Sequence, residues 1–144
     1  MKYILPFVLL ILISCQTDSP VSEEEQKTFE QMAQDYQSAY MEGSKNCDKI
    51  LGRMDREIRM WENGSIWSYA DLEKFCPHLP SKPVIQTYNK QVLLGHDLGY
   101  DYVSQLYLRR RGDTMRETTS RIWKKVGDDW KIVEMNSMLN LEIN

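Results

Sequence analysis

Glycine, proline, histidine and cysteine are all scarce in this 144-residue chain, which contains 7 Gly, 5 Pro, 2 His and 3 Cys. So little glycine and proline excludes a collagen-like or low-complexity chain. No CxxC pair or His-rich spacing is present, so we expect no zinc or other metal and no cofactor. The sequence also lacks a glycine-rich phosphate loop and the nucleophile elbow of serine hydrolases.

Strong charge of either sign is missing as well, because the net charge is −3 and the mean hydropathy is −0.54. An excess of basic residues is the usual mark of nucleic-acid binding, so we expect no nucleic-acid partner. Bulky side chains are plentiful instead, with 4 Trp, 8 Tyr and 8 Met. The length allows one folded domain, or at most a domain with a tail.

The N-terminus carries the one long apolar run, Tyr3–Ile13, which follows Lys2. This run is shorter than the roughly 20 residues of a spanning helix and is typical of a secretory signal peptide. The four residues Leu12-Ile13-Ser14-Cys15 resemble a bacterial lipobox, although an ordinary cleaved signal remains the alternative. The resemblance implies a signal peptide at 1–14 and a Cys15 that carries acyl chains such as palmitate. Residues 15–25 would then tether the domain to an inner or outer membrane of the bacterial cell envelope.

Helix signals come first along the chain, and strand signals follow. A capping box at Ser22–Glu25 begins an apolar stripe that ends near Gly43, and a weaker helical pattern runs from Cys47 to about Asp55. Asn63-Gly64 predicts a β-hairpin, and a short helix follows from Ser68 to Phe75. Residues 84–94, 100–109, 115–126 and 130–141 read as strands joined by turns. Helices before an antiparallel meander indicate an α+β fold.

The last two strands resemble the closing hairpin of NTF2-like domains, and the SnoaL-like and DUF4440 group in particular. The matching segments are Arg121–Lys125, a turn at Gly127, and Trp130–Ser137; Met60–Gly64 and the first helix also match. The resemblance covers about residues 27–141 and implies a domain at 26–144. Its fold would be a cone in which helices pack on a curved antiparallel sheet and leave a pocket.

The NTF2-like superfamily includes both enzymes and non-catalytic binding modules, so the fold alone does not decide the function. Related chains often carry His at the positions of Glu134 and Asn136, and this chain does not. We therefore expect a non-catalytic module that binds a small molecule or a partner. The alternative is a ketosteroid-isomerase-, cyclase- or hydrolase-like enzyme with Glu134 or Asp101 as the base. The resemblance also implies a homodimer that forms through the outer face of the sheet.

A set of polar and aromatic residues is expected to line the pocket. The period of two places Ile132, Glu134 and Asn136 on one face of the last strand, with Arg121 opposite Glu134 and Trp123 opposite Ile132. Arg121 could bind a ligand carboxylate or pair with Glu134. The aromatic residues could line a site for a small apolar ligand or fill the core. The candidates are Tyr36, Tyr40, Trp61, Arg121, Trp123, Glu134 and Asn136.

The remaining motifs each have two interpretations. Cys47 and Cys76 could form a disulfide, which an exported protein can retain, or stay as two buried thiols. The pair His96-Asp97 lies between glycines and reads as a turn rather than a metal site. The run Arg109–Arg111 reads as a solvated hairpin tip rather than as a membrane-binding surface.

Overall fold

The computed structural model describes residues 20–142, and the predicted signal peptide and Cys15 lie outside this range. The elements are α1 (Glu23–Glu42), a 3-10 turn (Gly43–Asn46), α2 (Cys47–Gly52), β1 (Met54–Glu62), β2 (Ser65–Trp67), α3 (Tyr69–Phe75), a second 3-10 turn (Cys76–His78), β3 (Val84–Leu94), β4 (Leu98–Leu108), β5 (Thr114–Val126) and β6 (Asp129–Glu142). None of the helices within residues 20–142 is both long and apolar enough to span a membrane.

Helix α1 begins and ends where its sequence predicts. The Ser22 side chain accepts a hydrogen bond from the Glu25 backbone amide. The Glu25 carboxylate accepts one from the Ser22 backbone amide, which completes the capping box. Gly43 ends the helix with φ +80°, a conformation that favours glycine. A Cβ at this position would lie 2.7 Å from the carbonyl oxygens of Leu79 and Pro80. The end of α1 is therefore packed directly against the segment that leads into β3.

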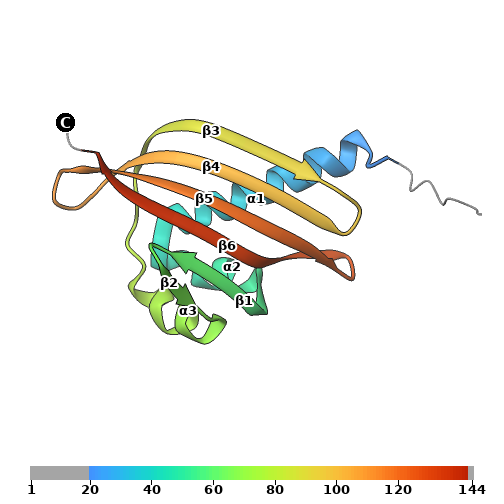
Figure 1. Ribbon diagram of the computed structural model, residues 1–144, viewed down its shortest axis with the longest axis horizontal. Coiled ribbons are helices and arrows are strands. Elements are labelled where there is room, and N and C mark those ends of the chain that lie inside the picture. Colours follow the sequence, from blue (N-terminus) through green and yellow to red (C-terminus); the bar gives the residue numbers. More distant parts are fainter. Residues whose placement is uncertain (1–19, 143–144) are drawn as a thin grey trace, which may run out of the picture.

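Six strands form one sheet in the order β2-β1-β6-β5-β4-β3. The long strands β3 to β6 make the expected antiparallel meander, whereas β1 runs parallel to β6, so the sheet is mixed. Helix α1 covers one face of the meander, and α2, α3 and the β1–β2 hairpin gather at the C-terminal end of α1 (Figure 1). The hairpin turns at Asn63 and Gly64, whose φ angles are 46° and 85°, as the Asn-Gly pair predicts.

A β-bulge in β6 changes which residues face the helix. Trp123 pairs with Ile132 as predicted, but Ile122 pairs with Glu134, which leaves Val133 as an extra residue. Ile132 and Met135 consequently both point to the concave face and are fully buried. The prediction that Ile132 and Glu134 share a face is wrong, and so is the predicted pairing of Arg121 with Glu134.

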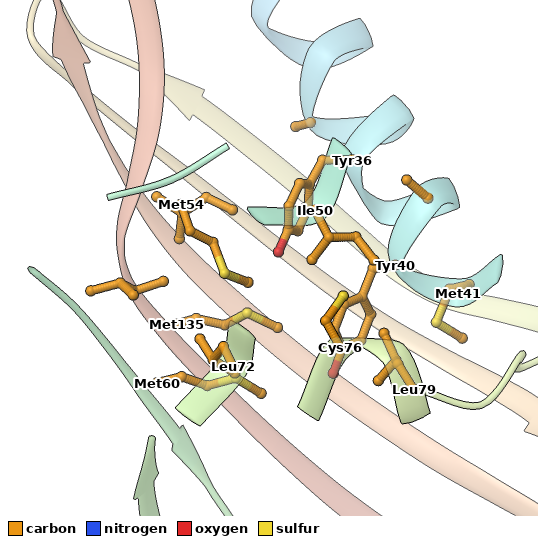
Figure 2. Packing of buried hydrophobic residues seen from close by; sticks show 14 of the residues in the cluster. Tyr36, Tyr40, Met41, Ile50, Met54, Met60, Leu72, Cys76, Leu79 and Met135 are labelled. Carbon is orange, nitrogen blue, oxygen red and sulfur yellow. The ribbon is translucent and has the colours of Figure 1, made fainter. Parts of the chain in front are cut away.

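Aromatic and methionine side chains fill the concave face between α1 and the sheet. Trp123 contacts Phe29 and Tyr36 edge-on, with ring centroids 5.8 and 5.6 Å apart. Figure 2 shows Tyr40 extending from α1 toward Cys76 and Leu79. Met54, Met60 and Met135 close the same core from β1 and β6. Of the two interpretations of these aromatic residues, packing in the core is the one that the structure adopts for Tyr36, Tyr40 and Trp123.

Cys47 and Cys76 form a disulfide, with their Cα atoms 5.7 Å apart. The bridge joins the start of α2 to the 3-10 turn after α3. Because the two cysteines are 29 residues apart in the sequence, the bond also closes a loop that contains β1, β2 and α3. The structure therefore contains the bridge rather than two free thiols.

Candidate functional site

The interior of the cone leaves almost no space for a ligand. The cavity at the end beside α2 and α3 has a volume of about 30 Å³, which is enough for one water molecule. Its lining includes Tyr40, Met54, Met60 and Leu72. Trp67 also lines it, and its buried Nε1 has no hydrogen-bond partner within residues 20–142. A drug-sized ligand needs about 300 Å³ or more, so this cavity does not hold one in the structure.

A buried ion pair lies at the centre of the concave face. Asp101 on β4 is the cross-strand neighbour of Arg121 on β5, and both side chains are almost completely buried. Arg121 Nε donates to both oxygens of Asp101 at 3.0 and 3.1 Å, and Nη2 adds a further bond. Trp123 Nε1 also donates to Asp101. The carboxylate therefore has its oxygens occupied by hydrogen-bond donors and is badly placed to act as a general base.

The ion pair continues into a chain of side-chain amides. Arg121 Nη1 donates to Gln37 Oε1 at 2.6 Å, and Gln37 Nε2 donates to Gln105 Oε1 at 2.8 Å. Gln105 Nε2 then donates to the Thr87 hydroxyl at 3.1 Å. These bonds connect the centre of the sheet to its edge strand, β3, and they satisfy the buried polar groups along the way.

The residues of this hydrogen-bond chain line a groove between α1, β3 and β4, which we call the edge groove. Its volume is about 310 Å³, within the range of small-molecule sites. Lys90 lies in the lining and donates to Gln34 at 3.1 Å. The lining residues are Ala33, Gln34, Gln37, Ser38, Met41, Val84, Thr87, Lys90, Val92, Asp101, Tyr102, Val103, Gln105 and Arg121. Two positive charges and one negative charge make this lining net positive.

A second buried ion pair lies at the C-terminal end of α1. Lys82 Nζ donates to Glu117 Oε2 at 2.7 Å, and the Ser137 hydroxyl donates to Glu117 Oε1 at 3.0 Å. The sequence does not reveal this pair, because Lys82 lies in a proline-flanked loop that predicts exposure. The alternation of β5 could have indicated that Glu117 faces inward with Arg121.

Burial perturbs several ionisable groups near these pairs. It raises the pKa of Glu62, which lines the small cavity, and the nearby Glu117 raises it further while Lys82 opposes the shift. Burial also raises the pKa of Tyr107 to about 12. The pKa values of Tyr36 and Tyr40 are raised by the same cause. The Tyr36 hydroxyl is buried and finds no hydrogen-bond partner in the described part of the chain.

The predicted site residues separate into two groups. Tyr36, Tyr40, Arg121 and Trp123 meet on the concave face. Trp61, Glu134 and Asn136 lie on the outer face instead, where Trp61 is opposite Asn136 and is 40% exposed. Glu134 faces away from the cone and is opposite Arg59, so its predicted place in the pocket is wrong. The physical reason is the bulge at Val133, which inverts the alternation of β6.

No group of three His, Cys, Asp or Glu side chains within residues 20–142 is arranged to hold a metal ion. His96 lies in the turn between β3 and β4, as the glycines around it predict. Arg109 in the next turn pairs with Asp113 at 3.5 Å, at the tip of the β4–β5 hairpin.

A long helix against the concave face of a curved sheet defines an α+β cone, and solved structures with this architecture are similar to the chain over most of its length. One is a cystatin-like fold protein from Burkholderia xenovorans, with a TM-score of 0.66, 12% identity, and coverage of 85% of this chain and 96% of the other. Another is an NTF2-like protein of unknown function from Pseudomonas putida, with a TM-score of 0.63, 12% identity, and coverage of 85% and 91%. A third is the association domain of CaMKII from C. elegans, with a TM-score of 0.61, 18% identity, and coverage of 81% and 98%.

These likenesses identify the fold as NTF2-like, in agreement with the resemblance of the closing hairpin. No protein-family model matches the chain, and no curated protein matches it.

Proposed function

We propose that this chain is a lipid-anchored, exported NTF2-like module that binds a ligand or a partner and does not catalyse a reaction. The observation that carries this proposal is the filled cone. Its cavity is about 30 Å³, and the two most deeply buried acids of the concave face, Asp101 and Glu117, are each paired with a cation. An acid that acts as a base also needs a free carboxylate oxygen, and the oxygens of Asp101 and Glu117 are occupied by hydrogen-bond donors.

The edge groove is the binding site in this proposal, and its ligand is a small carboxylate. The net positive lining favours an anion, and Lys90 is exposed where such a ligand would enter. Arg121 lies at the base but is already paired with Asp101, so its charge contributes less than that of Lys90. Apolar side chains such as Val92 and Val103 would contact the hydrocarbon part of the ligand.

Titration calorimetry with benzoate and octanoate measures their affinity for this site. Benzamide and octanol are the uncharged controls. Lys90→Gln is expected to weaken carboxylate binding about tenfold, because it removes one charge-assisted hydrogen bond. Lys45→Gln is the matched control, since Lys45 pairs with Glu42 on an exposed surface away from the groove. Equal affinity of the acids and their uncharged analogues would contradict the assignment.

We also propose that two copies associate through the outer face of the sheet. Leu93, Tyr100 and Ile122 lie side by side there on β3, β4 and β5, and Leu93 and Ile122 are exposed. An apolar row on a sheet face is a common protein interface. The similarity to an association domain supports the same assignment.

Sedimentation of a chain beginning at residue 20 tests the dimer, which we expect at micromolar concentrations. Ile122→Glu is expected to give a monomer, because it buries an unpaired charge at the centre of the interface. Ile66→Glu is the matched control, because Ile66 is also an exposed isoleucine but lies on β2, at the far edge of the sheet. A monomeric parent chain at high micromolar concentration contradicts the proposal.

The anchor has a separate test in bacterial cells. Cys15→Ala removes the acylation site, so the variant is expected to leave the membrane fraction while the parent chain stays in it. Retention of the variant in membranes contradicts lipid attachment through Cys15.

An isomerase- or hydrolase-like enzyme is the second candidate function, and one observation favours it. Glu62 lines the small cavity, is partly buried, and has a raised pKa, as a general acid or base often does. This role requires the cavity to open well beyond its volume of about 30 Å³. A substrate screen in which turnover depends on Glu62, and is lost in Glu62→Gln, would favour the enzyme over the binding module.

A further inference from the structure

Lys82 enters the cone from the loop before β3 and ends among acidic and aromatic groups. Its side chain is 7% exposed, and that of its partner Glu117 is 2% exposed. Besides the bond of 2.7 Å to Glu117, the ammonium lies 4.6 Å from the ring centroid of Tyr40 and 5.4 Å from that of Tyr107. The ammonium thus has a carboxylate and two aromatic rings around it.

These groups come from separate elements of the fold. Tyr40 lies on α1, Tyr107 on β4 and Glu117 on β5. Ser137 on β6 holds the second oxygen of Glu117, and Glu62 at the end of β1 is close enough to interact electrostatically with both Lys82 and Glu117. A carboxylate together with aromatic faces, shielded from water, is the arrangement by which proteins recognise organic ammonium ions.

The backbone on either side of Lys82 is fixed to the rest of the fold. The Lys82 amide donates to the Met41 carbonyl at 2.7 Å, and the Ser44 amide donates to the Leu79 carbonyl at 3.0 Å. On the other side, the Leu108 amide donates to the Pro83 carbonyl at 3.0 Å. The segment Leu79–Pro83 therefore holds the Lys82 side chain in place over the end of the cone.

We propose that Tyr40, Tyr107 and Glu117 form a binding site for a primary ammonium ion, and that Lys82 occupies it as a ligand tethered in the same chain. Burying such a pair costs a large desolvation energy, and apolar residues of the same size would often be equally stabilising. Stability alone therefore does not account for the pair. Because the tethered group has a high effective concentration, it keeps external amines out of the site.

Lys82→Ala tests the proposal, because it removes a fragment equivalent to n-propylamine and leaves the other groups in place. We expect protonated n-propylamine to bind the emptied site of the variant in the full chain. At a concentration about ten times Kd, the melting temperature of the variant should rise by about 6 °C. The melting temperature of the parent chain should not respond, because its own lysine fills the site.

Three controls separate the site from general effects of the amine. 1-Propanol has the same length without the charge and should not stabilise Lys82→Ala. Lys45→Ala, which breaks an exposed ion pair with Glu42, should not respond to the amine. Adding Glu117→Gln to Lys82→Ala should abolish the response, because the carboxylate that binds the ammonium is lost. An equal response in the parent chain, or in the Glu117→Gln background, overturns the proposal.

If Lys82→Ala does not fold on its own, the same titration is followed by circular dichroism. The amine is then expected to restore the folded signal and 1-propanol is not; failure of the amine overturns the proposal. An NMR measurement on the parent chain tests directly whether the Lys82 ammonium lies over the two rings. The rings of Tyr40 and Tyr107 should then shift the ε-methylene protons of Lys82 upfield. Unshifted ε-methylene resonances would show that the ammonium does not lie over the rings.

Discussion

Replacing Asp101 with Asn is expected to destabilise the protein strongly, although the two side chains have nearly the same shape. The Asn oxygen can still accept from Trp123 Nε1, but the amide NH₂ then faces the N–H groups of Arg121. Arg121 is 1% exposed, so its positive charge would remain buried without a counter-ion. Breaking one partner of a buried ion pair costs about 3–5 kcal/mol. For a domain of this size, the melting temperature should fall by about 12–20 °C.

Urea denaturation followed by tryptophan fluorescence and by circular dichroism measures this effect. Glu42→Gln is the matched control, because it breaks an ion pair with Lys45 that is exposed, and its stability should stay close to that of the parent chain. The double variant Asp101→Leu with Arg121→Met should be more stable than Asp101→Asn, since neither charge is then left unpaired. A loss below about 1 kcal/mol for Asp101→Asn would refute the reasoning, because it would mean that water in the edge groove solvates Arg121.

Three further predictions concern stability. Removing the disulfide with Cys47→Ser and Cys76→Ser, or by reduction, should cost about 3–4 kcal/mol in denaturant titrations, and unchanged stability would mean that the bridge constrains little. Gly43→Ala should cost about 2 kcal/mol or more, because its Cβ meets the Leu79 carbonyl at 2.7 Å and its φ is +80°; the same change at Gly52, which has open space around it, is the control. Burial raises the pKa of Glu62 in the folded state, so its contribution to stability is greatest at low pH and is lost as pH rises through the raised pKa. Relative to Glu62→Gln, the parent chain should therefore lose stability as the pH rises above 4.5, the ordinary pKa of a glutamate, and parallel stability curves would contradict this.

The paired acids bear directly on function. Asp101 and Glu117 lie on the concave face of the sheet, and each carboxylate is held by a cation and by a further donor. The space that a substrate would need is filled by side chains from α1, β1 and β6. A groove of about 310 Å³ lies at the edge of the sheet instead, beside β3. These two observations are the ones on which the proposal of binding at that edge rests.

Local signals in the sequence predicted the elements well, because local interactions decide them. The capping boxes at Ser22 and Ser68 each start a helix at the expected residue. The Asn63-Gly64 turn needs only the backbone freedom of those residues. The span of β3, Val84–Leu94, also agrees with the strand read from its residues.

The tertiary structure decided which side chains meet, because these contacts depend on register and on residues far apart in the sequence. The bulge at Val133 shifts the register of β6 against β5 by one residue. As a result, Glu134 lies on the outer face, opposite Ile122 on β5 and Arg59 on β1. Arg121 consequently pairs with Asp101 on the opposite neighbouring strand and reaches Gln37, which is 84 positions away. The scarcity of glycine, histidine and metal-ligating cysteine indicated from the sequence that the chain lacks common catalytic motifs. Whether the abundant aromatic residues line a pocket or fill it depended on how α1 packs into the sheet, which no local pattern encodes.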